Sequence, residues 1–310
     1  MDVIRYPDDP RPTEWVSPVL ALGNFDGLHR GHMTIVRQVV QSAEAAGRTP
    51  VLLTFDPHPA RVVRPDGGPR LLMTTAQKIE VLRESGIRGI VVVRFTRELS
   101  QWPPERFVDT VLVRWLQTSE VWVGANFLFG RDRSGNFPLL REEGARHGFA
   151  ARKVDSVQYA GQVVSSTRIR GLVAVGDVSD AAVLLGRRYS IDGTVVHGDG
   201  RGRTLGFPTA NLEPADQLLP ARGVYATVAR VGEEWLPSVT NVGVHPTVGA
   251  AAGDLVEVHL LRGGRDIYGE AVRLEFASRL RGEQAFPSVE ALRQAIAADC
   301  ARAMAFLASN

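Results

Sequence analysis

Two histidines beside a glycine-rich turn are the first side chains in the sequence that could do chemistry. His29 and His32 follow the turn Gly23–Gly27. An apolar run, Val19–Leu22, precedes this turn, and apolar residues at helical spacing begin at Met33. That order predicts a strand, a tight turn and a helix N-terminus, whose unpaired N–H groups and positive dipole end favour phosphate. Residues three apart face the same point, so both imidazoles could donate to the oxygens of a nucleoside triphosphate.

The turn has other interpretations, which the residues alone leave open. It could be a surface turn whose histidines have no chemical role. Zinc fits less well, because metalloprotease helices need an HExxH motif and the single cysteine, Cys300, excludes a cysteine-rich site. The Walker A motif is absent, and no G-x-G-x-x-G follows a strand and opens a helix.

A second group of candidate residues lies in the segment His197–Asn211. It contains four glycines together with cationic and hydroxyl side chains, which is typical of a loop that cradles phosphate. A flexible hairpin would have the same composition. Thr209 and Asn211 alternate, so both side chains could offer oxygens to a hard cation such as Mg²⁺.

Two further positions each have a structural and a chemical interpretation. The segment Ser165–Arg170 opens a predicted helix, where its hydroxyls could be plain N-caps or could grip a triphosphate together with Arg168 and Arg170. Glu257 interrupts an otherwise apolar strand and shares a face with His259. A carboxylate among apolar neighbours is costly to desolvate unless it has a partner or a function, so a structural salt bridge and a catalytic role both remain open.

Alternating strands and helices must position the first set of residues. The predicted elements are strand Pro50–Phe55, helix Thr75–Ser85 with Ile79 and Leu82 inward, strand Ile90–Phe95, helix Pro104–Leu116 and strand Glu120–Val123. This alternation predicts βαβ units and a parallel sheet with both faces covered. Ligands of such sheets bind beyond the carboxyl ends of the strands, which is where the polar, Gly- and His-rich clusters fall.

The pattern changes near residue 187. A short helix, Val178–Leu185, comes before the change, and the strands predicted after it are Ser190–His197, Gly223–Val231, Leu236–Gly243, Asp254–Leu261 and Ile267–Phe276. Gly- and Pro-rich turns separate these strands, which indicates a compact antiparallel barrel. A last helix runs from an N-cap at Ser288 to about Leu307, with Cys300 on its apolar side. We therefore predict two domains, residues 1–186 and 187–310.

Bulk properties exclude several classes of protein. A chain of 310 residues is long enough for about two domains with their own cores. The net charge of +2 does not favour a nucleic-acid partner, and no apolar run is long enough to cross a membrane. The N-terminus lacks the features of a signal peptide, and one cysteine fits a reducing cytoplasm. A weak homo-oligomer is compatible with the sequence, although no motif indicates one.

Several motifs together resemble those of prokaryotic bifunctional riboflavin kinase/FAD synthetases. They are GNFDGLHRGH, FDPHP, SSTRIR, GFPTAN, NVGVHPT, EVHL and DIYG, in the family's order, and the match runs from about residue 17 to 307. The H-x-G-H element is shared more widely, with other adenylyltransferases and class I aminoacyl-tRNA synthetases. The resemblance implies a Rossmann-like nucleotidyltransferase sheet followed by a small β-barrel with a C-terminal helix.

The resemblance implies that the N-terminal domain transfers AMP from ATP to FMN, giving FAD and pyrophosphate. The residues carried over for ATP are Gly23, Asn24, Phe25, Asp26, His29, His32, Ser166, Thr167 and Arg168, and those for the flavin are Asn126, Phe127 and His58. His29, His32 and Arg168 would be the catalytic ones among them. The attacking FMN phosphate oxygen is already ionised, so positioning and charge neutralisation should suffice without a general base.

The C-terminal domain would phosphorylate riboflavin with ATP. Here the nucleophile is a neutral ribityl hydroxyl, so a base is useful, and Glu257 would take its proton. The residues that the resemblance assigns to ATP are Gly198, Gly206, Pro208, Thr209 and Asn211. Thr209 and Asn211 would also bind Mg²⁺, and Asn241 and Glu257 would bind the flavin.

The sequence departs from the family's pattern at a few positions. Leu128 stands where the family usually has Arg, Val248 where Phe often follows Pro-Thr, and Arg262–Gly263 where Asp-Phe is usual. These departures concern substrate affinity more than chemistry, because Glu257 and Asn211 are retained. Two alternatives to a bifunctional enzyme follow: a monofunctional relative with one half silenced, and a flavin-binding regulator without turnover.

Overall fold

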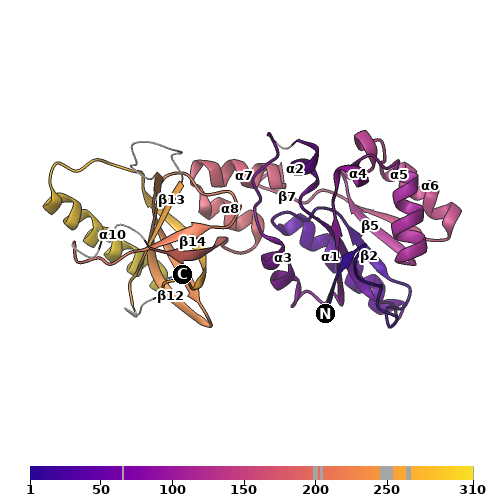
Figure 1. The fold of residues 1–310 in the computed structure, drawn as a ribbon, viewed down its shortest axis with the longest axis horizontal. Helices are drawn as coiled ribbons and strands as arrows, with labels where there is room; N and C mark the ends of the chain where they lie inside the picture. The colour runs from indigo at the N-terminus through magenta and orange to yellow at the C-terminus, as the bar shows by residue number, and fades with distance from the viewer. Residues whose placement is uncertain (65, 198–201, 203–204, 245–253, 263–266, 310) are drawn as a thin grey trace. The chain divides into compact units, whose positions relative to one another are not determined.

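The chain folds into two compact units (Figure 1). The structure is a computed structural model that describes residues 1–64, 66–197, 202, 205–244, 254–262 and 267–309. The first unit comprises Met1–Leu71 and Thr75–Ser165, and the second comprises Leu72–Thr74 and Ser166–Asn310. The helices before residue 187 therefore group with the barrel, and the predicted boundary between residues 186 and 187 stays a prediction.

The first unit is built on a six-stranded parallel sheet in the order β1-β4-β3-β2-β5-β6. Its strands are β1 (Asp2–Tyr6), β2 (Val19–Leu22), β3 (Pro50–Asp56), β4 (Gly89–Arg94), β5 (Glu120–Gly124) and β6 (Ala150–Val154). The central strands are buried on both faces, as their continuous apolar sequences predict. The predicted parallel α/β sheet is confirmed.

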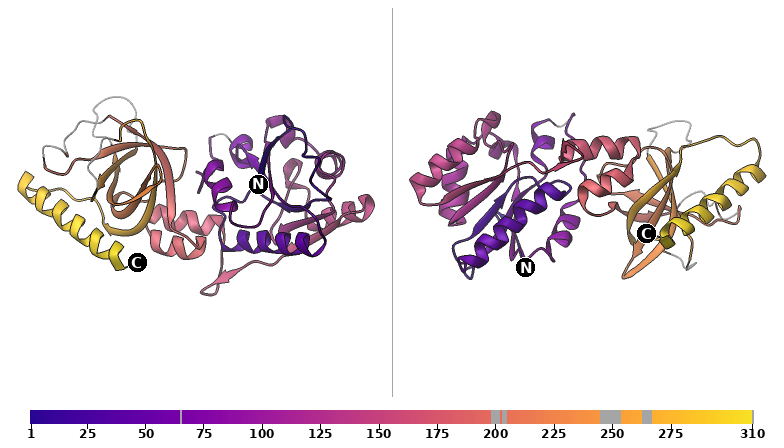
Figure 2. Two further views of the ribbon diagram at one scale, coloured as in Figure 1. Left: turned by 90° about the horizontal axis from the view of Figure 1, so that it is seen from below. Right: turned by 180° about the vertical axis from the view of Figure 1, so that it is seen from behind.

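Helices cover this sheet and complete its core. They are α1 (Arg30–Ala45), α2 (Pro59–Val63), α3 (Thr75–Leu82), α4 (Arg97–Ser100), α5 (Pro104–Phe107) with its π-helical continuation Val108–Trp115, a 3₁₀ turn (Arg131–Arg133) and α6 (Phe137–His147). A small hairpin, β7 (Gln158–Tyr159) and β8 (Gln162–Val163), follows β6. Val111 and Leu112 of the π-helix belong to one buried cluster with Leu20 and Leu53 of the sheet. Helix α1 contacts β2, β3 and β5, and its ribbon runs beside the strands of the sheet in Figure 2.

The second unit is a closed antiparallel barrel in the order β10-β13-β12-β11-β14-β9. Its elements are α7 (Ser166–Val175), α8 (Val178–Leu185), β9 (Tyr189–Val196), β10 (Ala210–Pro214), β11 (Gly223–Val231), β12 (Glu234–Val244), β13 (Asp254–Leu260), β14 (Ala271–Arg281) and α10 (Val289–Ser309). The predicted barrel is confirmed. The strand Ala210–Pro214 was not predicted, because a short segment after a glycine-rich loop gives a weak strand signal.

The last helix begins and packs as its sequence predicts. The Ser288 hydroxyl accepts a hydrogen bond from the Ala291 N–H at 3.1 Å, which caps the N-terminus of α10. Ala303 packs with Val224 and Val239 of the barrel, and Cys300 lies half-buried against the same cluster. Burial raises the pKa of the Cys300 thiol, with the Asp299 carboxylate acting in the same direction.

A buried glutamine joins the segment Leu72–Thr74 to the barrel within the second unit. Gln217 is fully buried; its Oε1 accepts from the Asp192 N–H at 2.9 Å, and its Nε2 donates to the carbonyl oxygens of Ser190 at 3.2 Å and Leu72 at 3.4 Å. Leu72 and Met73 are themselves buried. The chain thus contributes three residues to the second unit before it returns to the first at α3.

No helix in the part of the chain that the structure describes is long and apolar enough to cross a membrane.

Candidate active sites

The strand order brings three of the predicted clusters to one edge of the parallel sheet. β2 lies between β3 and β5, and the chain reverses its direction of winding between β2 and β5. The carboxyl end of β2 leads into Gly23–Gly27, that of β3 into Pro57–His58, and that of β5 into Ala125–Phe127. Such a reversal is where open α/β sheets bind their ligands.

The turn after β2 has an unusual backbone that two buried side chains hold in place. Phe25, Gly27 and Leu28 have φ angles of 49°, 86° and 39°, in the left-handed region that favours glycine. The side chains of Phe25 and Leu28 are only 1% and 0% exposed, so packing compensates for the strain of these non-glycine residues. A Cβ on Gly23 would lie 3.3 Å from the Phe25 ring, which leaves little room for another residue there.

The two histidines form one structural feature at the start of α1. His29 is the N-cap residue, and its Nδ1 accepts a hydrogen bond from the His32 N–H at 3.3 Å. The two imidazole rings stack with centroids 3.6 Å apart and planes at 17°, and the Phe25 ring meets His32 edge-on at 5.3 Å. A Cβ on Gly31 would lie 3.2 Å from the His29 ring, which accounts for the glycine in H-x-G-H.

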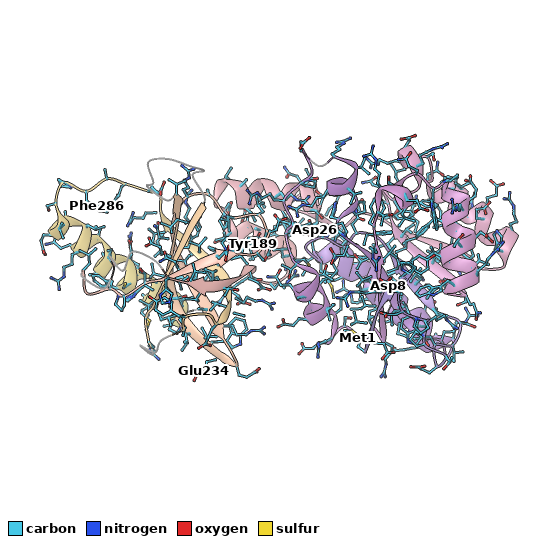
Figure 3. The ribbon with its side chains drawn as sticks, in the orientation of Figure 1. Met1, Asp8, Asp26, Tyr189, Glu234 and Phe286 are labelled. Atoms are coloured by element: carbon cyan, nitrogen blue, oxygen red, sulfur yellow. The ribbon has the colours of Figure 1, made fainter. Side chains whose placement is uncertain are left out.

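A buried lysine that sequence reasoning missed lies beneath this turn. Lys78 on α3 is 5% exposed and donates from Nζ to the Asn24 carbonyl at 2.8 Å and to Thr54 Oγ1 at 2.7 Å. Burial lowers the pKa of Lys78 to about 8, against the opposing effect of the Asp26 and Asp56 carboxylates. Asp26 is itself buried and is labelled in Figure 3.

The predicted inward face of α3 is therefore partly wrong. Leu82 is buried as expected, but Ile79 is only half-buried, whereas Gln77 and Lys78 are buried. Lys78 and Leu82 are four residues apart, so they share one face of the helix. Hydrogen bonds and nearby carboxylates make the burial of the ammonium tolerable.

The flavin residues predicted in the first unit follow β3 and β5. His58 caps α2, its Nδ1 accepting from the Ala60 N–H at 3.2 Å. Asn126 is exposed, and the half-buried Phe127 ring stacks on Phe129 with centroids 5.2 Å apart and planes at 20°. Leu128, where the family usually has Arg, is 44% exposed.

The other residues predicted to bind ATP together with the histidines lie at the start of α7. Ser166 and Arg168 are half-buried and Thr167 is exposed. All three belong to the second unit, whereas the histidines belong to the first. Their contact with the same ATP molecule stays a prediction.

Three predicted residues of the barrel lie side by side in one row. Asn211 on β10 and Asn241 on β12 both pair directly with Glu257 on β13. Directly opposed residues in an antiparallel sheet project from the same face, so the three side chains share a surface. The alternate residues Val256 and Val258 are 0% and 3% exposed, which places the carboxylate on the face away from these buried valines. Asn241 Nδ2 donates to Glu257 Oε2 at 3.3 Å.

The loop before β10 is held against this row by His259. Its Nδ1–H donates to the Pro208 carbonyl at 2.7 Å, and its ring meets Phe207 edge-on at 5.6 Å. A Cβ on Gly202 would lie 2.8 Å from Thr209 Oγ1, so the loop approaches itself closely there. Gly206 lies in the same loop, and its φ of 87° suits glycine. The predicted ATP residue Gly198 lies outside the described residues, as do Val248 and Gly263.

Glu257 could have been the acidic half of a structural salt bridge. Within the described part of the chain, however, no Lys, Arg or His side chain forms an ion pair with its carboxylate. The same part holds no group of three His, Cys, Asp or Glu side chains that could bind a metal by themselves. Thr209 and Asn211 nevertheless offer hydroxyl and amide oxygens beside a carboxylate. Such oxygen donors fit Mg²⁺, which binds proteins through few groups and takes further ligands from substrate phosphates.

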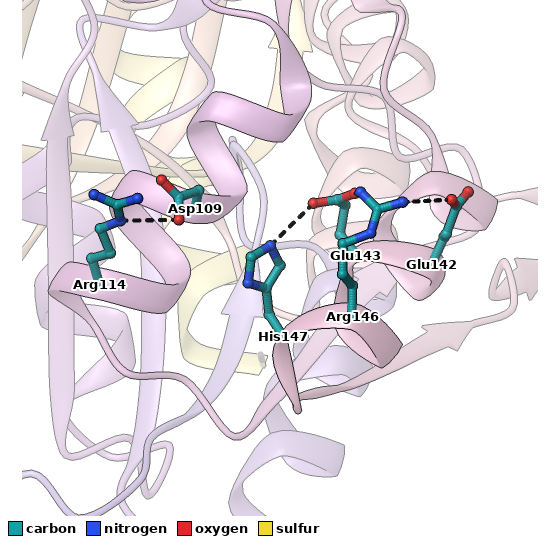
Figure 4. Close-up of polar contacts among 6 residues, drawn as sticks. All are labelled: Asp109, Arg114, Glu142, Glu143, Arg146 and His147. Carbon is teal, nitrogen blue, oxygen red and sulfur yellow. Dashed lines mark hydrogen bonds and ion pairs between the residues drawn. The ribbon is translucent and has the colours of Figure 1, made fainter.

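A close histidine–carboxylate pair lies within α6 and is local to that helix (Figure 4). His147 Nε2 lies 3.4 Å from Glu143 Oε2, and Arg146 Nη1 lies 2.5 Å from Glu143 Oε1. Basic side chains in the last turn of a helix interact favourably with its dipole. These contacts, one turn apart on the same helix, stabilise α6.

The comparisons with known proteins agree with this division of the chain. A family model described as FAD synthetase matches residues 11–168, and one described as riboflavin kinase matches residues 185–307. A bifunctional riboflavin kinase/FMN adenylyltransferase of Pseudomonas fluorescens is 37% identical over 100% of this chain and 99% of its own length. One of Escherichia coli K12 is 36% identical over 91% of this chain and 90% of its own length.

A solved structure has the same fold over nearly the whole chain. It is the crystal structure of a protein from Streptococcus pneumoniae named as a macrolide-efflux protein, with a TM-score of 0.85 and 27% identity. The alignment covers 96% of this chain and 97% of that chain.

Proposed function

The chain belongs to the family of bifunctional riboflavin kinase/FMN adenylyltransferases, and we propose which of its residues serve each reaction. The protein phosphorylates riboflavin with ATP to give FMN, and it transfers AMP from a second ATP to FMN, giving FAD and pyrophosphate. In our proposal His29 and His32 serve the adenylyl transfer, and Glu257 serves the kinase reaction.

For adenylyl transfer, an ionised phosphate oxygen of FMN attacks the α-phosphorus of ATP, and pyrophosphate leaves. His29 accepts the His32 N–H at Nδ1, so in its neutral form Nε2 carries the proton and can donate to a phosphate oxygen. Donors fixed in advance stabilise the charge that develops on the phosphates. Gly23–Asp26 would line the same phosphates, and Ser166, Thr167 and Arg168 would supply further donors and a positive charge.

The flavin of FMN would lie on residues that follow β3 and β5. The Phe127 ring, already stacked on Phe129, offers an aromatic face, and Asn126 is exposed beside it. His58 lies after β3, which is two strands from β5 in the same sheet. This arrangement would set the flavin phosphate next to the turn after β2, the strand between them.

For phosphoryl transfer, Glu257 takes the proton of the ribityl hydroxyl as that oxygen attacks the γ-phosphorus of ATP, and ADP leaves. Asn241 holds Oε2 of this carboxylate at 3.3 Å, and Oε1 accepts no hydrogen bond from the described residues. The carboxylate is thus oriented and keeps one oxygen for the proton. Asn241 would also contact the flavin.

Mg²⁺ and ATP would be held beside Glu257 by the loop and the start of β10. Thr209 and Asn211 would hold the ion, and Gly206 and Pro208, with Gly198 before them, would line the ATP phosphates. The ion, when bound, neutralises charge on the β- and γ-phosphates. The chain's own part is to keep Thr209 and Asn211 next to the base, through the His259 contact with Pro208.

Three further expectations from the sequence belong to the same proposal. They are a cytoplasmic location, partners that are small molecules and not nucleic acid or membranes, and at most a weak homo-oligomer. A gel-filtration run over a range of protein concentrations would test the last of these.

The observation that carries most weight is the row of Asn211, Glu257 and Asn241, because three predicted residues from three strands meet in register. The test is to supply riboflavin and Mg-ATP and to resolve the products by chromatography. The wild type should form FMN and then FAD, and His32→Ala should accumulate FMN. Glu257→Gln should form no FMN but convert added FMN to FAD. Formation of only one product by the wild type would support a monofunctional relative, and flavin binding without ATP consumption would support a regulator.

A further inference from the structure

Lys78 is the most deeply buried ammonium that the proposed mechanism does not use. It closes a triangle of hydrogen bonds beneath the turn after β2. Its Nζ lies 2.8 Å from the Asn24 carbonyl oxygen and 2.7 Å from Thr54 Oγ1, and Thr54 Oγ1 donates to the same carbonyl at 2.9 Å. The Asn24 carbonyl therefore accepts two hydrogen bonds from the buried side of the turn.

This fixes the direction of the next backbone N–H. A trans peptide is planar, with its C=O and N–H pointing in opposite directions. The bond between Asn24 and Phe25 therefore aims the Phe25 N–H away from Lys78 and Thr54. Within the described part of the chain this N–H has no hydrogen-bond partner, although most backbone donors have one. Phe25 has a φ of 49°, and its side chain is buried. The packing of the ring therefore prevents the peptide between Asn24 and Phe25 from flipping.

We propose that Lys78 is a positioning residue for adenylyl transfer, which fixes the Asn24 carbonyl and thereby presents the Phe25 N–H to the phosphates of ATP. This rests on the proposed function, since it assumes that ATP binds at the turn. In that arrangement the N–H is a preorganised donor beside the His29 and His32 side chains. Lys78 itself does not touch the substrate.

The positive charge of Lys78 adds a second effect at the same place. A cation in a poorly solvated position attracts phosphates more strongly than one in water. The carboxylates that face it are Asp26 on the turn and Asp56 at the end of β3. Because the pKa of Lys78 is about 8, its charge is lost progressively as the pH rises through this value. ATP affinity for adenylyl transfer should fall over that pH range.

The test uses Lys78→Met and Thr54→Val in the full-length protein. Met keeps the volume of the side chain but has neither donor nor charge, and Val is nearly isosteric with Thr but has no hydroxyl. For Lys78→Met we expect kcat/KM for ATP in FAD formation to fall roughly 10- to 100-fold, the effect of losing an oriented donor. For Thr54→Val the same kcat/KM should fall only about threefold to tenfold, because the Asn24 carbonyl keeps one of its two hydrogen bonds, the one from Lys78.

Three readouts separate positioning from a merely structural role. The KM for FMN should change little in either variant, and FMN formation by the same protein should be unaffected. The fall of kcat/KM for ATP above pH 8 should be present in the wild type and in Thr54→Val but absent in Lys78→Met. The melting temperature of Lys78→Met should fall, because the substitution leaves the buried Asp26 carboxylate without its cation. The rates are therefore measured well below that temperature, where a merely structural role would leave kcat/KM for ATP unchanged.

The proposal would be overturned if Lys78→Met kept both the kcat/KM for ATP and the pH profile of the wild type. An unchanged Thr54→Val beside an impaired Lys78→Met would overturn the route through the Asn24 carbonyl. Thr54→Val also decides the question if Lys78→Met fails to fold. His32→Ala distinguishes this proposal from the proposed function: if that variant forms FAD normally, the site itself is wrongly assigned, whatever Lys78 does.

Discussion

The imidazoles of His29 and His32 stack on each other at 3.6 Å, and the backbone N–H of His32 donates to Nδ1 of His29. His29 therefore does two things at once. It caps the helix with Nδ1, and in our proposal its other ring nitrogen donates to a phosphate of ATP. The cap and the chemistry can be separated by substitution, since several residues can cap a helix but few can donate as an imidazole does.

His29→Asn and His29→Ala form a matched pair. Asn is a good N-cap residue, so His29→Asn should keep the melting temperature, whereas His29→Ala should lose about 1 kcal/mol of stability. Both should slow FAD formation by roughly 10- to 1000-fold, because each lacks the phosphate donor. Thermal melting and FAD assays on both variants check this. Normal FAD formation by His29→Asn would show that His29 only caps the helix.

Gly31→Ala should reduce FAD formation without loss of stability. Alanine is favoured over glycine in helices by up to about 1 kcal/mol, so the melting temperature should stay or rise. The new Cβ would lie 3.2 Å from the His29 ring and push it by a few tenths of an ångström. Small displacements of a positioned donor are costly in catalysis, so we expect a loss of about tenfold or more in FAD formation. FMN formation by the same protein is the internal control.

Glu257→Gln should reduce kinase turnover by roughly 10²–10⁴-fold, the usual effect of losing a general base. Gln is nearly isosteric, so riboflavin and ATP binding should change little, and added FMN should still become FAD. A lower melting temperature with nearly normal FMN production would instead assign Glu257 a structural role. Rates of both reactions and the melting temperature, measured on this one variant, decide between the two.

Asn241→Ala tests how Glu257 is oriented. It removes the donor to Oε2 and should slow the kinase reaction by about tenfold, less than the loss of the base itself. The double variant with Glu257→Gln should be no slower than Glu257→Gln alone, because groups that act through one another are not additive. Additive losses in this double-mutant cycle would mean that Asn241 acts independently of Glu257, through the flavin alone.

The extent of the second unit can be tested with two fragments. Val178, Ala181, Leu184 and Leu185 of α8 are at most 4% exposed, and α8 lies against β9 and β14. Burial of a large apolar side chain contributes about 1.5–3 kcal/mol. Removing the buried residues of α8 from the fragment should therefore cost nearly as much free energy as the whole stability of a small domain. A fragment of residues 166–310 should melt well above one of residues 187–310 and phosphorylate riboflavin without making FAD. Equal melting temperatures would support the predicted boundary at 186/187.

The parallel sheet was predictable from the sequence because its central strands are buried on both faces and read as continuous apolar runs. β1 was not, because only one of its five residues, Ile4, is buried. The candidate residues of the barrel were found by type and motif, but their meeting in one row depends on strand register. Register arises from pairing between distant segments, and β11 and β14 even shift register twice along their length.

Lys78 shows a different limit. Lysine is mostly exposed in proteins, so helical periodicity alone assigned the inward face of α3 to Ile79 and Leu82. Lys78 can be buried because the Asn24 carbonyl and the Thr54 hydroxyl, from two other parts of the chain, accept hydrogen bonds from its ammonium group. A single helix cannot reveal partners that come from elsewhere in the fold. Only the spacing of Lys78 from Leu82 offered a signal.

The short excursion of Leu72–Thr74 into the second unit limits how the gene for this protein could be divided. Leu72 and Met73 are 2% and 5% exposed, and Gln217 holds the Leu72 carbonyl. A gene cut after codon 165 would encode a first half whose middle carries two apolar side chains without their cover. Fission into two separate enzymes would therefore select for polar residues at these positions. The test compares the solubility of a fragment of residues 1–165 with that of the same fragment carrying Leu72→Ser and Met73→Ser. Higher solubility of the substituted fragment is expected, and equal solubility would count against this inference.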